Sequence, residues 1–284
     1  MGIPLRRCAR HAGCPQEGYC LIVPLAARVR LSYNEGAMSN ASLLEHVSIV
    51  LVRTKTPGNI GSVARAMMNM GLSRLVLVRP PKDPAGDMVK FAAGAYRVIA
   101  DARVCATLDE AVEGHQLVAG TSRRRSRMRK NVVRPRMFAE TVVPLLGENR
   151  IAVVFGPEVD GLERTDLALC QDIVSIPSTD AFPSINLSHA VMVVVYELLV
   201  ASLGGAGSAQ RRLADAEDLE RFFGHLQQTL EQIGFLDRNS YCDRDRMMFT
   251  LRQIFGRARL EPRDVSILRG ILTQTGRVSA KKSV

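Results

Sequence analysis

Polar residues that could act on a ligand occur in three separated stretches of the sequence. The first, PGNIGSVARAMMNMG (57–71), contains Gly61, Ser62, Arg65 and Asn69 at helical spacing. Residues three and four apart share one face of a helix, so these four are expected to lie together. The small residues would leave room for a large group to approach the arginine. The alternative interpretation is a surface arginine on an ordinary packed helix.

The second stretch, VVFGPEVDGL (153–162), has Gly156 directly after a predicted strand and Glu158 in the turn that follows. A glycine at that point lets a ligand approach the backbone closely. A Gly–Pro turn with a solvated glutamate explains the same residues without a ligand. The stretch alone leaves both interpretations open.

The third stretch, IPSTDAFPSINLSHA (176–190), ends a predicted strand and begins a strongly apolar helix. Ser184 and Asn186 are expected at the start of this helix, where they could cap it or face a ligand together with free backbone N–H groups. The segment 187–201 is apolar on nearly all sides, which predicts burial against the sheet on one side and a second subunit on the other. His189 is interpreted as a structural histidine.

A run of basic residues, RRRSRMRK (123–130), follows the predicted strand end AGTS. The chain as a whole has a net charge of +10 and a pI near 9.7. An anionic partner, either nucleic acid or an acidic membrane surface, is therefore expected. The run lies beside the predicted ligand edge of the sheet, so we interpret it as a contact to nucleic-acid phosphates. The alternative is a solvated loop.

The hydrophobic pattern predicts an α/β domain with a mostly parallel sheet and helices on both faces. Asn59 is expected to cap the first of its helices, and Gly71 to stop it. The predicted strands are 46–52, 74–81, 115–122, 150–156 and 172–177, and the predicted helices are 56–71, 161–170 and 184–201. Ligands of such sheets bind at the carboxyl ends of the strands, where all three polar stretches lie.

Changes of composition divide the chain into four expected parts. They are an irregular N-terminal extension (1–40), the α/β domain (41–202), a linker (203–210) and a small all-helical C-terminal domain (211–284). Cys8, Cys14 and Cys20 lie in the extension, but their spacing matches no common zinc pattern, so no metal is expected. No apolar run approaches the ~20 residues of a membrane span, so no membrane association is expected.

In this order and with these intervals, the three polar stretches resemble the three motifs of the SPOUT superfamily of RNA methyltransferases, in particular the TrmJ-type tRNA 2′-O-methyltransferases. NIGSVARAMMNMGL resembles the first motif, VVFGPEVDGL the second and IPSTDAFPSINLSHAVMVVVYEL the third. The resemblance covers about residues 46–200. It implies a C-terminal trefoil knot, S-adenosylmethionine as cofactor, a homodimer with its site at the subunit interface, tRNA as partner and a cytoplasmic location.

The resemblance also assigns roles by position. The family's polar active-site positions correspond to Asn59, Arg65, Glu158, Ser184 and Asn186. Its cofactor-binding positions correspond to Thr121, Ser122, Gly156, Ile176, Pro183, Ser184 and Ile185. Pro183 departs from the pattern, because relatives often carry a second serine there. Pro157 stands where many TrmJ-type proteins carry a basic residue.

The expected function is therefore S-adenosylmethionine-dependent 2′-O-methylation of tRNA, with cytidine or uridine 32 of the anticodon loop as the expected target. Arg65 would activate the ribose hydroxyl through its charge or together with a phosphate. Two alternatives stay open at this point. One is a ribosomal RNA 2′-O-methyltransferase of the same superfamily, and the other is a catalytically inactive RNA-binding protein with this fold.

Overall fold

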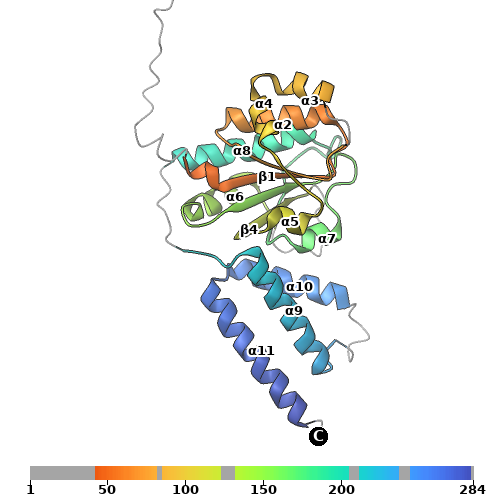
Figure 1. Cartoon of the computed structure of the whole chain (residues 1–284), viewed down its shortest axis with the longest axis vertical. Helices are drawn as coiled ribbons and strands as arrows, with labels where there is room; N and C mark the ends of the chain where they lie inside the picture. Colours follow the sequence, from red (N-terminus) through yellow and green to blue (C-terminus); the bar gives the residue numbers. More distant parts are fainter. Residues whose placement is uncertain (1–41, 82–84, 123–131, 205–210, 237–243, 283–284) are drawn as a thin grey trace, which may run out of the picture. The chain divides into compact units, whose positions relative to one another are not determined.

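The computed structural model describes residues 42–81, 85–122, 132–204, 211–236 and 244–282 (Figure 1). The described part contains a seven-stranded sheet in the order β3-β2-β1-β6-β4-β7-β5, and all pairs of neighbouring strands in it are parallel. The strands are β1 (Val47–Val52), β2 (Arg74–Val78), β3 (Arg103–Cys105), β4 (Leu117–Thr121), β5 (Val132–Val133), β6 (Ile151–Phe155) and β7 (Asp172–Val174).

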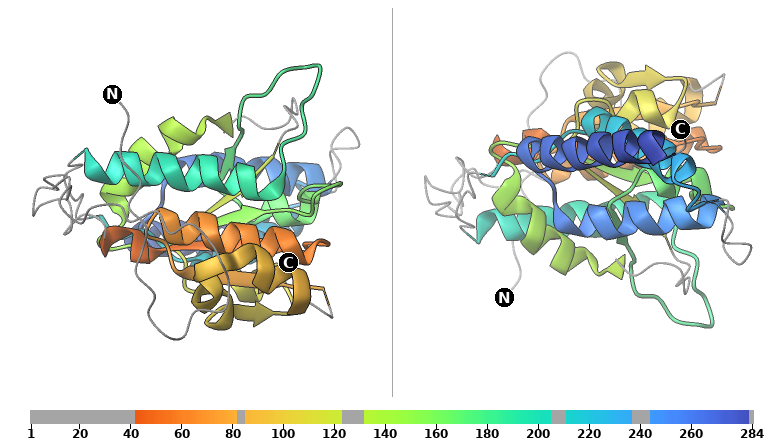
Figure 2. Two further views of the ribbon diagram at one scale, coloured as in Figure 1. Left: turned by 90° about the horizontal axis from the view of Figure 1, so that it is seen from above. Right: turned by 90° about the horizontal axis from the view of Figure 1, so that it is seen from below.

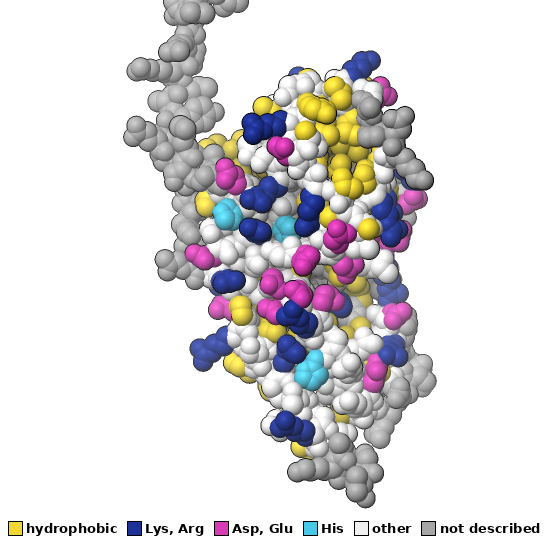
Figure 3. Space-filling view, in the orientation of Figure 1, with side chains coloured by type: hydrophobic (Ala, Val, Ile, Leu, Met, Phe, Trp, Pro, Cys, Tyr) yellow, Lys and Arg dark blue, Asp and Glu magenta, His cyan; other side chains and the backbone are white. Residues whose placement is uncertain are grey.

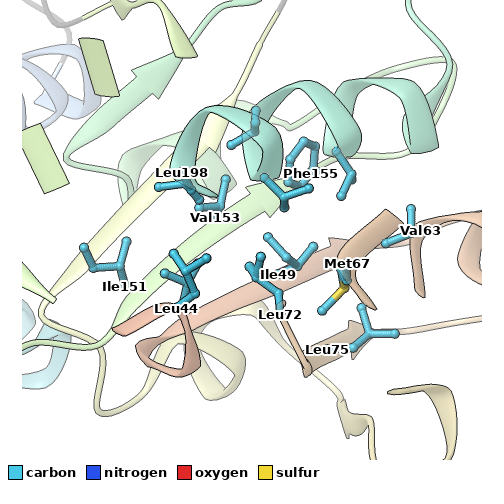
Figure 4. Close-up of a cluster of buried hydrophobic side chains, with 14 of the residues drawn as sticks. Leu44, Ile49, Val63, Met67, Leu72, Leu75, Ile151, Val153, Phe155 and Leu198 are labelled. Carbon is cyan, nitrogen blue, oxygen red and sulfur yellow. The ribbon is translucent and has the colours of Figure 1, made fainter. Parts of the chain in front are cut away.

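Strand side chains alternate between two hydrophobic cores, one on each face of the sheet. In β6, for example, Ile151, Val153 and Phe155 enter one core, whereas Ala152 and Val154 enter the other. All five are buried, which explains why this strand reads as a continuous apolar run and not as an alternating one. Figure 4 shows the first core, where side chains from β1 and β6 meet those of two helices.

The helices cover both faces of the sheet, as predicted (Figures 1 and 2). On one face lie α2 (Pro57–Asn69), α3 (Ala85–Ala92), α4 (Tyr96–Ala100), α6 (Pro135–Val142) and α8 (Leu187–Leu203). On the other lie α5 (Leu108–Val112) and α7 (Arg164–Ala168). Short 3-10 turns occupy Ser42–His46, Ala93–Ala95 and Val143–Leu145.

The C-terminal region is all helical, as predicted, and has a small core of its own. It comprises α9 (Ala216–Gln232), α10 (Arg244–Ala258) and α11 (Pro262–Lys282). The rings of Phe222 and Phe255 meet edge to face with their centroids 5.0 Å apart, and Val265 of α11 belongs to the same cluster. Such a contact stabilises the packing of α9 on α10 beyond the area that it buries.

Several local predictions change in the structure. Asn59 does not cap the first helix, because α2 begins at Pro57 with Thr56 in the N-cap position. Gly71 does follow the helix end with a left-handed φ of +78°, as a helix stop requires. The last helix of the α/β part begins at Leu187 and not at 184, since Asn186 caps it by accepting a hydrogen bond from the Ser188 N–H at 2.9 Å.

Strands also end earlier than predicted, and some elements were not predicted. β2 stops at Val78, where Arg79 turns to a left-handed φ of 48°, and β7 stops at Val174. β3, β5 and the helices α3 to α6 had no counterpart in the sequence-based expectation. Among the described helices, none is both long and apolar enough to cross a membrane. The trefoil knot and the boundaries of the four parts stay predictions.

Candidate cofactor and RNA site

A cavity of about 530 Å³ opens at the carboxyl ends of β4, β6 and β7. Its wall includes all the residues predicted to bind the cofactor: Thr121, Ser122, Gly156, Ile176, Pro183, Ser184 and Ile185. Glu158 lines it as well. The volume lies within the range of small-molecule sites, and the position is where open parallel sheets bind ligands.

The end of β4 is fixed by hydrogen bonds to both of its neighbours. The Thr121 hydroxyl donates to the Val154 carbonyl of β6 at 3.0 Å, and the Ser122 N–H donates to the Val174 carbonyl of β7 at 3.0 Å. Each of these contacts crosses from one strand end to the next. The floor of the cavity is therefore rigidly built from three strands that are far apart in the sequence.

Gly156 lines the cavity, but the space beside its α-carbon is already occupied. A Cβ at this position would lie 2.3 Å from the Leu162 nitrogen and 2.4 Å from the Gly161 carbonyl carbon. The loop 157–162 folds back on itself here, helped by Gly161 at φ +70° and its N–H bond to the Pro157 carbonyl. The glycine is needed for this fold-back, because any larger residue at position 156 would clash with the chain's own backbone.

Glu158 joins the second polar stretch to the first. One of its carboxylate oxygens accepts hydrogen bonds from the Asn59 side chain at 2.8 Å and from the Thr56 N–H at 3.2 Å. The other accepts from the Lys55 N–H at 3.0 Å. Asn186 of the third stretch donates to the Asn59 side-chain oxygen at 3.1 Å. A continuous line of hydrogen bonds therefore connects all three stretches.

These contacts also determine the charge state of Glu158. Partial burial raises the pKa of its carboxyl, but the hydrogen bonds from Asn59 and from the Lys55 and Thr56 N–H groups outweigh burial and hold the pKa below its usual value. The side chain is thus an anion whose oxygens are already occupied by donors. It is suited to orient its neighbours and poorly suited to take up a proton.

Arg65 does not reach this cavity from its own chain. It is exposed on α2 and is not among the residues that line the cavity. The predicted room beside Gly61 is also absent, because a Cβ there would lie 2.2 Å from the Met88 carbonyl oxygen of α3. Ser62 donates its hydroxyl to the Gly58 carbonyl within the same helix. The structure therefore places Glu158 and Ser184 in the cavity wall and connects Asn59 and Asn186 to Glu158 by hydrogen bonds, whereas Arg65 does not line the cavity.

The third stretch forms the outer wall of the cavity through an exposed loop. Ser184 is exposed there, and the preceding Pro183 carries no N–H, so that donor is missing from the wall. The Pro183 carbonyl accepts a hydrogen bond from the Ser178 hydroxyl at 3.1 Å, which ties the loop to itself. His189 is exposed and lies outside the cavity wall.

Several residues of the cavity wall were not predicted from the sequence, and Phe249 and Arg164 are two of them. Phe249 of α10 lines the cavity, and Arg164 of α7 lies over its ring with 5.8 Å from the guanidinium carbon to the ring centroid. Nothing in the sequence around Phe249 distinguishes it from the other apolar residues of an amphipathic helix. Its position depends on how α10 packs on α7, which only the fold specifies.

Other predicted features lie outside the described residues, namely the basic run 123–130 and the three N-terminal cysteines. Figure 3 shows one face of the molecule, on which Asp and Glu side chains gather across the middle, with Lys and Arg above and below. The positive net charge is therefore not spread evenly over this face. The carboxylates would repel a phosphate backbone that crossed them.

The structure thus has a parallel α/β sheet with a cavity at its strand ends, and hydrogen bonds join the three polar stretches beside that cavity. The model of the SpoU rRNA Methylase family matches residues 46–196, and that of the tRNA methyltransferase TrmJ C-terminal domain matches residues 217–283. The chain belongs to the TrmJ-type proteins of the SpoU methylase family.

Individual relatives agree with this placement over nearly their whole length. The chain is 42% identical over 250 residues to the tRNA (cytidine/uridine/adenosine-2′-O-)-methyltransferase TrmJ of Pseudomonas aeruginosa, covering 84% of this chain and 96% of the relative. It is 40% identical to the tRNA (cytidine/uridine-2′-O-)-methyltransferase TrmJ of Pectobacterium atrosepticum, covering 81% and 97%. The crystal structure of TrmJ from Z. mobilis ZM4 superposes with a TM-score of 0.69 at 34% identity, covering 80% of this chain and 97% of that one.

Proposed function

We propose that this chain transfers the methyl group of S-adenosylmethionine to a ribose 2′-hydroxyl of tRNA. The observation that carries the proposal is the line of hydrogen bonds from Asn186 through Asn59 to Glu158, beside a cavity whose wall contains every predicted cofactor residue. Family membership and the names of the relatives support the same reaction.

The cavity fits the chemistry of the proposed cofactor. Val174, Ile176 and Leu187 offer apolar surface for an adenine ring, and the Thr121 and Ser122 side chains add hydroxyl groups at the strand ends. When bound there, S-adenosylmethionine supplies an electrophilic methyl group on its sulfonium. The chain must then hold the ribose hydroxyl in line and favour loss of its proton, so positioning contributes much of the rate.

Arg65 is the residue that we assign to the hydroxyl. Arginine keeps its proton at neutral pH, so we infer that it lowers the energy of the developing ribose oxyanion through its charge, alone or together with a substrate phosphate. Asn59, Glu158, Ser184 and Asn186 would orient the ribose and the arginine. The occupied oxygens of Glu158 agree with an orienting role.

Arg65 does not line the cavity of its own chain. We therefore infer that a homodimer brings the Arg65 of one copy to the cavity of the other. The exposed side of α8 supports such an assembly. Val193, Tyr196, Val200 and Leu203 recur there at spacings of three and four, and they are 36%, 52%, 44% and 42% exposed. The buried side of the same helix packs on the sheet. We propose that α8 pairs with a second copy and that each site combines residues of both.

For the substrate, we propose tRNA nucleotide 32, as cytidine or uridine, methylated in the cytoplasm. The match to a tRNA methyltransferase C-terminal domain favours tRNA over ribosomal RNA. The intact set of polar site residues favours an enzyme over an inactive RNA-binding protein. Calorimetric binding of S-adenosylmethionine separates those two classes, and mapping of 2′-O-methyl groups in tRNA from cells lacking the gene tests the nucleotide.

The test of the catalytic assignment is Arg65→Ala, with Arg65→Lys as a charge-preserving variant. We expect Arg65→Ala to lower kcat for methyl transfer to tRNA by about 100-fold or more, a typical loss for a group that stabilises transition-state charge. The affinity for S-adenosylmethionine should stay within about twofold, since the proposed contact of Arg65 is to the ribose hydroxyl of the substrate and not to the cofactor. The lysine should retain part of the rate. Turnover near the wild-type value in Arg65→Ala would end the assignment.

A further inference from the structure

Arg53, directly after β1, has an unusual backbone conformation. Its φ is +52°, a left-handed value that residues with a side chain rarely adopt outside Asn and Asp. Its N–H donates to the Val78 carbonyl of the neighbouring strand β2 at 2.8 Å, which holds the backbone in place. Strain of this kind persists where the surrounding structure fixes it, often near functional sites.

The Arg53 guanidinium reaches across to the start of α7. Its two terminal nitrogens donate to the two carboxylate oxygens of Asp166 at 2.5 and 3.4 Å, and one of them lies 3.2 Å from Glu163. The Asp166 side chain is only 7% exposed and also accepts the Glu163 N–H at 2.9 Å. The hydrogen bond from Arg53 therefore joins a carboxylate that already fixes the first turn of α7.

This contact differs from an ordinary surface ion pair. Exposed pairs contribute little to stability because solvent screens them and both side chains lose freedom. Here the carboxylate is buried, and the fork of the guanidinium meets it with two hydrogen bonds, which adds geometric specificity. The Asp166 hydrogen bond raises the pKa of Arg53, so the guanidinium stays charged across the physiological range.

Residues 53–56, the turn that contains Arg53, also contact the beginning of the cavity loop 157–163. The Lys55 and Thr56 N–H groups donate to Glu158, and the Lys55 ammonium lies 3.3 Å from Asp160. Residues 53–56 thus bind the segment 157–166 both near its start and near its end. Residues 157–164 between these contacts form one wall of the cavity.

We propose that Arg53 is a positioning residue for the cofactor site, which acts by fixing the loop 157–163 through Asp166. Arg53 does not itself line the cavity, so its effect passes through the loop. The proposal rests on the proposed function, because it takes S-adenosylmethionine as the ligand of that wall. None of the sequence motifs that indicated the site includes Arg53.

The experiment measures the affinity of the full-length protein for S-adenosylmethionine by calorimetry, together with methyl transfer to tRNA. In Arg53→Asn the guanidinium is removed, while asparagine tolerates the left-handed backbone, so backbone strain does not confuse the result. We expect the Kd to rise about tenfold, because a misplaced binding wall is costly even when no ligand contact is deleted. Arg53→Lys keeps the charge but not the two-pronged contact, and its Kd should fall between the two.

Two controls separate positioning from general structural damage. Arg97→Ala removes an arginine whose pair with Asp101 is exposed at 91% and 67%, and it should leave the Kd unchanged within about twofold. In the double variant Arg53→Asn/Asp166→Asn, the Kd should rise no further than in the single variant with the larger effect. The effects of residues that act as one unit are not additive. A Kd within twofold of wild type in Arg53→Asn would overturn the positioning role of Arg53 but not the proposed function. Failure of the wild-type protein to bind S-adenosylmethionine would overturn the proposed function and this inference together.

Discussion

Glu158 accepts hydrogen bonds from three donors on the β1–α2 segment, and this limits what the residue can do. A carboxylate whose oxygens are occupied by N–H groups has a stabilised charge and a weakened affinity for a proton. A general base needs the opposite properties. In the proposed reaction, the proton of the ribose hydroxyl would then pass to a substrate phosphate or to solvent water, and the fixed positive charge of Arg65 would stabilise the oxyanion.

His115 makes a testable contribution to stability that depends on pH. The ring is buried, its Nδ1 lies 3.1 Å from the Val112 carbonyl, and its Nε2 lies 2.9 Å from the Ser48 hydroxyl. A carbonyl only accepts, so Nδ1 donates, and in the neutral ring Nε2 then accepts from the serine hydroxyl. Burial lowers the pKa of His115 below its usual value.

The unfolded chain therefore takes up a proton at His115 at a higher pH than the folded chain does. The contribution of His115 to the free energy of unfolding is therefore fully present above about pH 6.5, the pKa of the unfolded chain. It decreases as the pH drops below that value, by up to about 1.4 kcal/mol per pH unit, until the pKa of the folded chain is reached. We expect His115→Gln to flatten this part of the curve in urea unfolding between pH 7.5 and about 5.5. His189→Gln, at an exposed ring, should keep the wild-type slope. Equal slopes in all three proteins would contradict the assignment.

Single residues also show where sequence-based prediction reaches its limit. Asn59, Glu158 and Asn186 could be chosen from motif resemblance, yet their mutual hydrogen bonds join positions 99 and 127 residues apart and follow only from the fold. The glycines at 61 and 156 were correctly singled out as special. For Gly61 the expected room is absent, and at both glycines local sequence does not reveal that the chain's own backbone occupies the position of a Cβ.

Among the elements, long apolar runs were predictable and short edge elements were not. β1 and β6 lie in the middle of the sheet and are buried on both faces, so every residue in them is apolar or small. β3 and β5 are the two outer strands, with only three and two residues, and they have partly exposed side chains. Such short strands are defined by their pairing partners, which no local pattern encodes.

The contact between α2 and α3 depends on Gly61, and this can be tested by adding one methyl group. In Gly61→Ala the new Cβ would lie 2.2 Å from the Met88 carbonyl oxygen and 2.8 Å from the Ala92 nitrogen, both of them backbone atoms. The helices must then separate, so we expect a loss of about 1–3 kcal/mol in the free energy of unfolding. Chemical denaturation measures this change directly.

Gly86→Ala, in the first turn of α3, is the matched control. Nothing lies within 4 Å of the added Cβ there. Replacing glycine by alanine at an unobstructed helical position should be neutral or stabilise the protein by up to about 1 kcal/mol. If both variants changed stability equally, the close approach of α3 to Gly61 would be refuted.

At the scale of the whole molecule, the C-terminal helices are attached to the strand that forms part of the cavity. Arg259, in the turn before α11, donates to the carboxylate of Asp172 at 2.5 Å, and this carboxylate is 3% exposed at the first residue of β7. Val174, at the opposite end of the same short strand, lines the cavity. A region matched by the family's C-terminal domain model is therefore fixed to a strand that also lines the cavity.

The exposed apolar side of α8 leads to a prediction about assembly. An unpaired stripe of this kind on a stable helix is unfavourable in water and marks an interaction surface, and a closed two-fold dimer would bury it on both copies. We expect Tyr196→Glu combined with Val200→Glu to place charges in that interface and convert the protein to a monomer in light scattering after size exclusion. Loss of the dimer should also abolish methyl transfer, since the Arg65 of one copy would no longer reach the cavity of the other. Val104→Glu, at a 61% exposed valine on β3, should keep the wild-type mass. A double variant that stayed dimeric would show that α8 does not join the subunits. A monomeric variant with full activity would show that the site lies within one chain.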